Sequence, residues 1–142
     1  MLVKTIKYKD YNDNEREEDF YFNLRQDEMV KMQFGTLGGL DEALKKIMKS
    51  ENTPEIFNFF EKLILTAYGE KSLDGKYFNK SEELSKQFQC TEAYNILFME
   101  LIKDPKNIEE FLLGCFPSEL ASQVEDQIKE NGELDLSVLD KK

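Results

Sequence analysis

The sequence predicts a mainly α-helical fold, a multi-helix domain that carries an N-terminal β-hairpin. Apolar and polar residues alternate only within residues 1–24, whereas apolar residues recur at helical spacing farther along the chain. Capping residues followed by proline or glutamate recur in the second half. We therefore expect one α-rich domain over residues 1–130, with the hairpin at 1–24 and helices at 27–130, and a short acidic C-terminal tail at 131–142.

The first expected element is the hairpin. Residues 2–8 favour a strand because β-branched and aromatic side chains are frequent there. Asn12, Asp13 and Asn14 tolerate the left-handed backbone that a turn requires. In the return strand, residues 17–24, one face consists of Phe20, Phe22 and Leu24. A lone two-stranded hairpin is only marginally stable, so this apolar face should pack on helices or on another chain.

Three helices are expected next. Residues 27–34 favour a short helix, and a second one carries a single apolar stripe over residues 40–48. Thr53 is a good N-cap for a third helix, and Pro54 stands at the first helical position, where proline is favoured. The helix that they begin is apolar nearly all round through Tyr68, which makes it the expected central helix of the core. Gly69 is expected to end it.

The remaining elements follow from turn and cap residues. Asp74 and Gly75 predict a tight turn, with residues 76–78 briefly extended after it. Ser81, Thr91 and the Asp104–Pro105 pair are typical helix starts. A last helix is expected after Pro117 and Ser118, and it should end at Asn131 and Gly132.

Charge and cysteine usage limit the partners. The chain has 142 residues, 29 of them acidic and 19 basic, which gives a net charge of −10. Such a surface repels phosphate and anionic lipid, so we expect no nucleic acid and no membrane as a partner. The opening residues lack an apolar signal core. In the reducing cytoplasm that we therefore expect, Cys90 and Cys115 should both be free and at least partly buried.

The inventory of chemical groups favours a protein that is not an enzyme. The chain has no histidine, which excludes histidine-dependent triads and histidine metal sites. Two cysteines cannot form a four-ligand zinc site unaided. The glycines at 35, 38 and 39 match neither the Walker phosphate-binding loop nor the dinucleotide-binding fingerprint. We assign no catalytic, cofactor-binding or metal-binding residues and expect no cofactor.

A calcium-binding loop is the one metal motif that the sequence suggests, over residues 10–15. The loop needs glycine at its sixth position and glutamate at its twelfth, but Glu15 and Tyr21 stand there. The adjacent carboxylates Glu17 and Glu18 favour solvated surface over an acid–base pair. A hairpin turn is the better interpretation.

The most informative segment is residues 67–101. It contains AYGEKSLDGKYF at 67–78, KSEEL at 80–84 and TEAYNILFMEL at 91–101. With the KYKDYNDNEREEDFYFNL hairpin and GGLDEALKKI before it, this segment resembles the tail assembly chaperones of long-tailed, siphovirus-type bacteriophages of Gram-positive bacteria. The resemblance covers most of residues 4–125.

This resemblance implies a late protein that binds the tape-measure protein and the tail tube subunit while the tail is built. It implies action in the cytoplasm of a bacterial host and absence from the mature virion. A frameshifted longer form of the protein itself is a further partner that the resemblance implies. As a hypothesis, Lys141 and Lys142 mark a place where a slippery codon run would sit.

The resemblance does not identify the partner-binding residues. Stripes at helical spacing are usually core, which is our interpretation of Phe57, Phe60, Tyr94 and Phe98. The partner surface is expected off this stripe or on the hairpin edge. That edge would also allow a homo-oligomer, although its charges favour protection equally. Two alternatives stay open: an acidic inhibitor that mimics DNA, and a structural tail or neck component.

Overall fold

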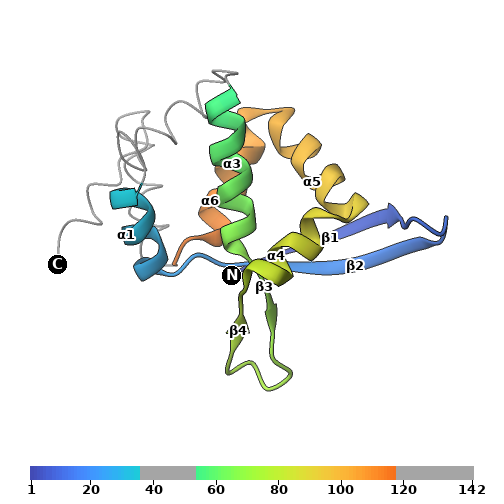
Figure 1. Ribbon diagram of the computed structural model, residues 1–142, viewed down its shortest axis with the longest axis horizontal. Helices are drawn as coiled ribbons and strands as arrows, with labels where there is room; N and C mark the ends of the chain where they lie inside the picture. The colour runs from blue at the N-terminus through green and yellow to red at the C-terminus, as the bar shows by residue number, and fades with distance from the viewer. Residues whose placement is uncertain (36–53, 118–142) are drawn as a thin grey trace.

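The computed structural model describes residues 1–35 and 54–117 (Figure 1). In these residues, four antiparallel strands form one sheet in the order β1-β2-β3-β4, accompanied by five helices. The elements in chain order are β1 (Leu2–Lys9), β2 (Glu15–Phe22), α1 (Gln26–Gly35), α3 (Pro54–Ala67), β3 (Tyr68–Lys71), β4 (Phe78–Asn79), α4 (Glu82–Gln89), α5 (Glu92–Ile102) and α6 (Pro105–Cys115).

The predicted fold class was wrong, because the fold is mixed α/β and not mainly α. The N-terminal hairpin is confirmed, but a second hairpin, β3–β4, extends it into a sheet. β3 continues directly from α3 and is too short to show an alternating pattern. Its pairing with β2 joins distant parts of the sequence, so local periodicity carried no signal for it. The helix expected at 40–48, the last expected helix and the tail at 131–142 lie outside the described residues.

The first hairpin is long and regular. Its register runs from Leu2 opposite Phe22 to Lys9 opposite Glu15. Asp10 closes the turn, because its Oδ1 accepts hydrogen bonds from the backbone N–H groups of Asn12 at 2.9 Å and Asn14 at 3.0 Å. Arg16 donates to the other oxygen of Asp10 at 2.6 Å, and this bond is the main reason that the pKa of Asp10 lies below its usual value.

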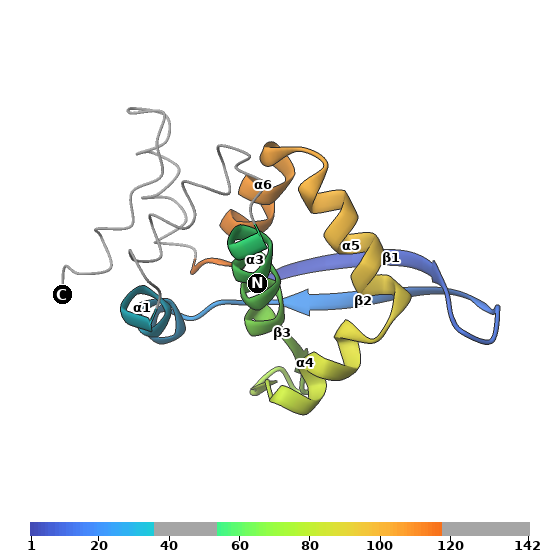
Figure 2. The same ribbon diagram turned by 45° about the horizontal axis from the view of Figure 1, so that its top comes forward.

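The core lies between the sheet and the helices. Figure 1 shows α3, α5 and α6 on one side of the β1–β2 ribbon, and Figure 2 shows α5 crossing it, with α4 beside β2. Phe22 is at the centre, with its ring centroid 5.2 Å from that of Phe111, 5.7 Å from Phe88 and 5.9 Å from Tyr68. Phe22 is fully buried. The predicted alternation in β2 therefore does point one face into the core.

The predicted helix starts at Ser81, Thr91 and Asp104 are confirmed. The Ser81 hydroxyl accepts a hydrogen bond from the N–H of Leu84, and the Thr91 hydroxyl accepts one from the N–H of Tyr94. The Asp104 carboxylate accepts from the N–H of Lys106, with Pro105 as the first helical residue. Each cap allows a sharp change of chain direction, and these changes bring α4, α5 and α6 over the sheet in turn. Helix α3 begins at Pro54 as predicted, whereas Thr53 lies outside the described residues.

The aromatic stripe belongs to the core region, as interpreted. Phe60 is buried, and Tyr94 and Phe98 pack half-buried against the core. The ring of Phe57, also half-buried, lies 6.4 Å from that of Phe98. Burial raises the pKa of the Tyr94 hydroxyl far above its usual value, with Glu61 adding to the effect. These rings are therefore poor candidates for a partner surface.

The two cysteines differ. Both are free, but Cys115 is buried and Cys90 is exposed, so the expectation that both are at least partly buried was wrong for Cys90. Cys90 follows the end of α4, where the chain turns toward the Thr91 cap and leaves the core. Burial raises the pKa of the Cys115 thiol to about 12, which keeps it protonated at neutral pH.

Candidate partner-binding surfaces

The described part of the chain offers several surfaces to other molecules. Within residues 1–35 and 54–117, no group of three or more cysteine, aspartate or glutamate side chains is placed to hold a metal ion. No helix in the same residues is both long and apolar enough to cross a membrane. Three surface features remain as places where another molecule would bind: a groove between helices, the edges of the sheet, and the tip of the second hairpin.

The groove lies between α1, α3 and α4. Its volume is about 600 Å³, and side chains of both polar and apolar character line it. Leu65 of α3 supplies apolar surface, while Glu61 and Lys62 of the same helix and Gln89 of α4 supply polar groups. The side chain of Gln89 donates a hydrogen bond to Glu61 across the groove. The two helices that line the groove, α3 and α4, are therefore already joined by a side-chain hydrogen bond.

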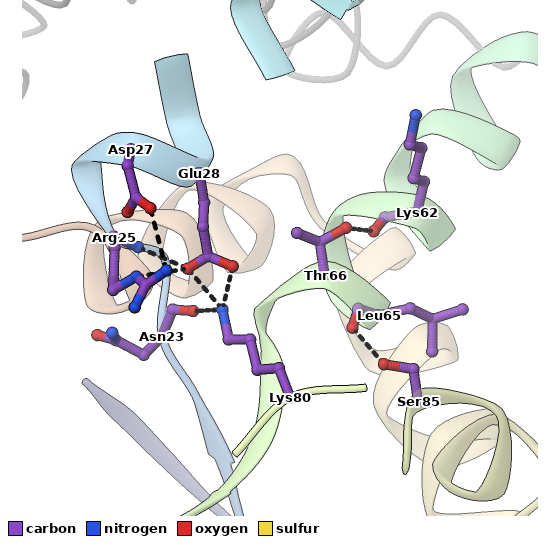
Figure 3. Close-up of polar contacts among 9 residues, drawn as sticks. All are labelled: Asn23, Arg25, Asp27, Glu28, Lys62, Leu65, Thr66, Lys80 and Ser85. Atoms are coloured by element: carbon purple, nitrogen blue, oxygen red, sulfur yellow. Dashed lines mark hydrogen bonds and ion pairs between the residues drawn. The ribbon is translucent and has the colours of Figure 1, made fainter. Parts of the chain in front are cut away.

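An ion pair forms one end of this groove (Figure 3). The ammonium nitrogen of Lys80 lies 2.8 Å from both carboxylate oxygens of Glu28, and it also donates to the carbonyl oxygen of Asn23 at 2.5 Å. The backbone N–H of Arg25 donates to the same carboxylate at 3.0 Å. Both charged side chains are mostly buried, so this pair is screened less than a surface pair. It fastens the start of α1 to the residue that follows β4.

Helices α3 and α4 are joined in the same region. The Ser85 hydroxyl donates to the carbonyl oxygen of Leu65 at 2.8 Å, and the Thr66 hydroxyl donates to that of Lys62 at 2.7 Å (Figure 3). Several polar groups of the groove, including those of Ser85, Thr66, Gln89 and Lys80, thus have partners within the protein. A ligand that relied on hydrogen bonds would have to break these contacts, which makes the groove a weak candidate for polar recognition.

The sheet edges follow from the hydrogen-bond pattern. The N–H of Asn23 donates a hydrogen bond to the carbonyl oxygen of Ala67, beside β3. The N–H of Asp10 donates one to the carbonyl oxygen of Asn14, beside the first turn. In an antiparallel ladder, hydrogen-bonded positions alternate. Odd-numbered residues of β2 therefore face β3, and even-numbered ones face β1. It follows that the odd-numbered residues of β1 direct their backbone groups to the free edge of the sheet, and these are Val3, Thr5, Lys7 and Lys9.

Both edges of the first hairpin are charged. Lys7 and Lys9 lie along the β1 edge, and Glu15, Glu17 and Asp19 lie along the part of β2 that β3 does not reach. Lys7 and Glu17 form an exposed ion pair at 3.8 Å across the two strands. Charged edges, lysine above all, disfavour pairing with another strand. These edges are better suited to keeping the protein soluble than to recruiting a partner strand.

The second hairpin departs from the body of the protein. Figure 1 shows β3 and β4 projecting from the sheet on the side away from α3, α5 and α6. At its base, a Cβ atom on Gly69 would lie 2.7 Å from the ring of Phe78 and 2.8 Å from the carbonyl oxygen of Asn79. Only glycine allows this close approach. The ammonium group of Lys71 lies 5.4 Å from the ring centroid of Tyr21, which braces the hairpin against β2.

The tip of the second hairpin is defined as residues 72–77, and its own polar groups hold it. The N–H of Ser72 donates to the carbonyl of Tyr77 at 2.8 Å, and Gly75 adopts a positive φ of 77°. The Asp74 carboxylate accepts from the Ser72 hydroxyl at 2.7 Å and from the N–H of Lys76 at 3.0 Å. The hydroxyl contact is the main reason that the pKa of Asp74 is lowered.

Large apolar side chains are exposed on this tip. Leu73 is fully exposed at 107% of its reference area, and Tyr77 is exposed at 57%. The turn of the first hairpin carries Tyr11, which is exposed at 78%. Scattered apolar side chains on a surface need no explanation, but two on one small projecting turn form a local cluster.

Comparison with known protein families decides the identity. A family model described as phage tail assembly chaperone matches residues 1–140. The chain belongs to the phage tail assembly chaperone family. Neither the curated proteins nor the solved structures gave a match. In this tail assembly chaperone, the motif at 67–101 comprises the end of α3, the second hairpin, α4 and α5.

The resemblance stated from the sequence is therefore confirmed at the level of the family. No site residue was predicted, and the expected place of the partner surface, off the helical stripe or on the hairpin edge, stays a prediction. The sequence did predict the turn at Asp74 and Gly75. It gave no sign that this turn projects from the chaperone, because the projection depends on the pairing of β3 with β2.

Proposed function

We propose that this tail assembly chaperone binds the tape-measure protein and the tail tube subunit during tail morphogenesis. It acts in the cytoplasm of a bacterial host, on behalf of a siphovirus-type phage of Gram-positive bacteria, and is absent from the mature virion. The family match over residues 1–140 carries this proposal. The protein performs no catalytic step in it.

The fold supports a role in transient binding. The aromatic rings of the described helices are largely used in the core, so the body does not depend on a partner to cover them. A net charge of −10 helps to keep the chaperone in solution. Such a carrier stays in solution while it holds an apolar helical partner. A longer frameshifted form and a homo-oligomer are further partners in this proposal.

Co-expression tests the proposal. The tape-measure protein and the tube protein encoded with the chaperone are each produced alone and with the full-length chain. The soluble fraction of each is then compared, and co-purification is measured through a tag on the chaperone. We expect both tail proteins to gain solubility and to co-purify.

An unrelated protein of similar size and acidity is the control for a general effect of charge. Equal rescue by the control, or no co-purification of either tail protein, would contradict the proposal. Mass spectrometry of purified particles tests the other half of it. Detection of the chaperone as a stoichiometric virion protein would favour a structural tail or neck component instead.

A further inference from the structure

The tip of the second hairpin is the strongest unassigned feature of the described surface. It lies at the end of a projection that leaves the body on the side away from α3, α5 and α6 (Figure 1). Neither Leu73 nor Tyr77 belongs to the core cluster or packs against it. Their exposure gives the isolated chaperone no stability, since burial of apolar area is what stabilises a fold.

The tip is also ordered in advance. The hydroxyl of Ser72 accepts from the N–H of Tyr77 at 2.9 Å, and the carbonyl of Ser72 accepts from the N–H of Gly75 at 3.0 Å. Together with the bonds to Asp74, these contacts fix the turn from inside. A segment that is fixed before binding loses less conformational entropy when a partner covers it.

The charges around the tip differ from those of the whole chain. Lys71 precedes the tip and Lys76 precedes Tyr77, and both lysines are exposed. Glu70 and Asp74 are exposed as well, but the Asp74 carboxylate accepts hydrogen bonds from within the loop. Among the described residues, neither lysine forms an ion pair. The ammonium group of Lys76 lies 5.4 Å from the ring centroid of Tyr77. Over residues 70–77 the two lysines balance Glu70 and Asp74, so this part lacks the acidic excess of the whole chain. Its exposed ammonium groups can face carboxylates at the rim of an apolar pocket.

We propose that the tip of the second hairpin is the element by which this chaperone docks on a tail protein. Leu73 and Tyr77 enter an apolar pocket of that protein, and carboxylates at the rim of the pocket face Lys71 and Lys76. This inference rests on the proposed function and adds the surface and the chemistry of the partner. Buried aromatic and aliphatic anchors surrounded by a polar rim are the usual source of binding energy in such contacts.

The first hairpin supplies a matched control. Tyr11 is an exposed aromatic residue on a turn, as Tyr77 is, but its neighbours Asp10 and Asp13 are acidic. Replacing Tyr11 removes a similar apolar area from a hairpin turn without touching the proposed docking element. An effect that depends only on exposed aromatic area would appear in both variants.

The experiment measures the dissociation constant of the full-length chain for the tape-measure protein and for the tube protein. The variants are L73S/Y77S and Y11S. We expect L73S/Y77S to weaken binding of at least one tail protein by about tenfold or more, because loss of anchor residues has effects of that size. Y11S should stay within about twofold of the unchanged chain. The thermal midpoint of both variants should match that of the unchanged chain, since neither site is buried.

A second variant tests the acidic rim. K71Q/K76Q should weaken binding and reduce its dependence on salt between low and physiological ionic strength, because attraction between exposed charges is screened by salt. K103Q/K106Q, which changes two exposed lysines beside the turn between α5 and α6, is the control for the same change in total charge. An unchanged salt dependence in K71Q/K76Q would contradict the acidic rim.

The outcomes separate the inference from the proposed function. If the unchanged chain binds neither tail protein, the proposed function fails and the inference fails with it. If it binds and L73S/Y77S binds equally well, the docking site is wrong while the function stands. If L73S/Y77S keeps its tail-protein affinity but loses self-association in sedimentation, the tip contacts a second copy of the chain, which also overturns the inference.

Discussion

The two hairpins of this tail assembly chaperone use their residues in opposite ways. The first has strands of eight residues, and the side chains on one face of it, including Phe20 and Phe22, are buried under helices. The second has strands of four and two residues, and its turn carries Leu73 and Tyr77 in solvent. The first hairpin therefore forms part of the core, whereas the second is attached to the core at its base and exposes its tip to solvent.

The cause of this difference is local. In the second half of β2, Phe20 and Phe22 lie on the face that the helices bury, whereas Asp19 and Tyr21 lie on the opposite face. The second hairpin has no such face, and its base is attached to the body by the pairing of Tyr68 and Gly69 with β2. The close approach of Gly69 to Phe78 holds its two strands together, and the lysines near it add contacts. Stability should therefore be sensitive to changes in the first hairpin and at this attachment, and insensitive to changes at the tip.

The largest expected effect is in the first hairpin. Phe22→Ala removes a fully buried ring that contacts Tyr68, Phe88 and Phe111, so it should lower the free energy of unfolding by about 3–5 kcal/mol. Denaturant unfolding followed by circular dichroism measures it. The control is Leu73→Ala, which should change that free energy by less than about 0.5 kcal/mol. Similar losses in both variants would mean that the two hairpins do not differ in their contribution to stability.

A smaller effect is expected at the base of the second hairpin. Gly69→Ala places a methyl group against the Phe78 ring and the backbone of Asn79, which must move apart. We expect a loss of about 1–3 kcal/mol, the usual range for overpacking. Glu70→Ala, an exposed neighbour, is the control and should be nearly neutral. If Gly69→Ala is as stable as its control, the close approach does not hold the hairpin.

The ion pair between Lys80 and Glu28 should contribute less. Lys80→Met removes the charged partner of a mostly buried carboxylate, which keeps only its contacts with Arg25. We expect a loss of about 1–2 kcal/mol, near the lower end of the range for hydrogen bonds to charged groups, because both side chains are partly exposed to water. Lys86→Met changes an exposed lysine of α4 and serves as the control. A neutral result for Lys80→Met would mean that α1 does not need this link to the second hairpin.

The reactivity of the two cysteines shows whether the core stays closed when the tip is changed. Burial raises the pKa of the Cys115 thiol to about 12, so it stays protonated and covered at pH 8, whereas Cys90 is exposed. A thiol reagent at pH 8 should therefore modify one cysteine quickly in the folded chaperone and the second only on unfolding. C90S should abolish the fast reaction. Leu73→Ala should leave Cys115 protected, and fast modification of Cys115 in that variant would contradict the separation between tip and body.

How far the sequence predicts this structure depends on the range of each signal. The first hairpin, the caps at Ser81, Thr91 and Asp104, and the turn at Asp74 were predicted because their signals lie within a few residues. β3 was missed because its four residues directly follow a helix and are too few to show an alternating apolar pattern. They form a strand because they pair with β2.

The surface was harder to predict than the elements. The family resemblance in residues 67–101 is confirmed, yet it does not say which of these residues face solvent. Exposure of Leu73 depends on the direction of the whole hairpin, and apolar residues in a sequence are assigned to the core by default. Cys90 was misjudged for the same reason, since its exposure depends on how the chain leaves α4.

Hydrogen exchange of the full-length chaperone, alone and with each tail protein in turn, measures directly whether the tip is the docking element. We expect the amides of β1 and β2 to be protected in the free and bound states and to change little. The amides of residues 72–77 should gain protection in at least one complex. Gain of protection along the β1 edge or around the groove of α3 and α4, with residues 72–77 unchanged in both complexes, would rule out docking through the tip.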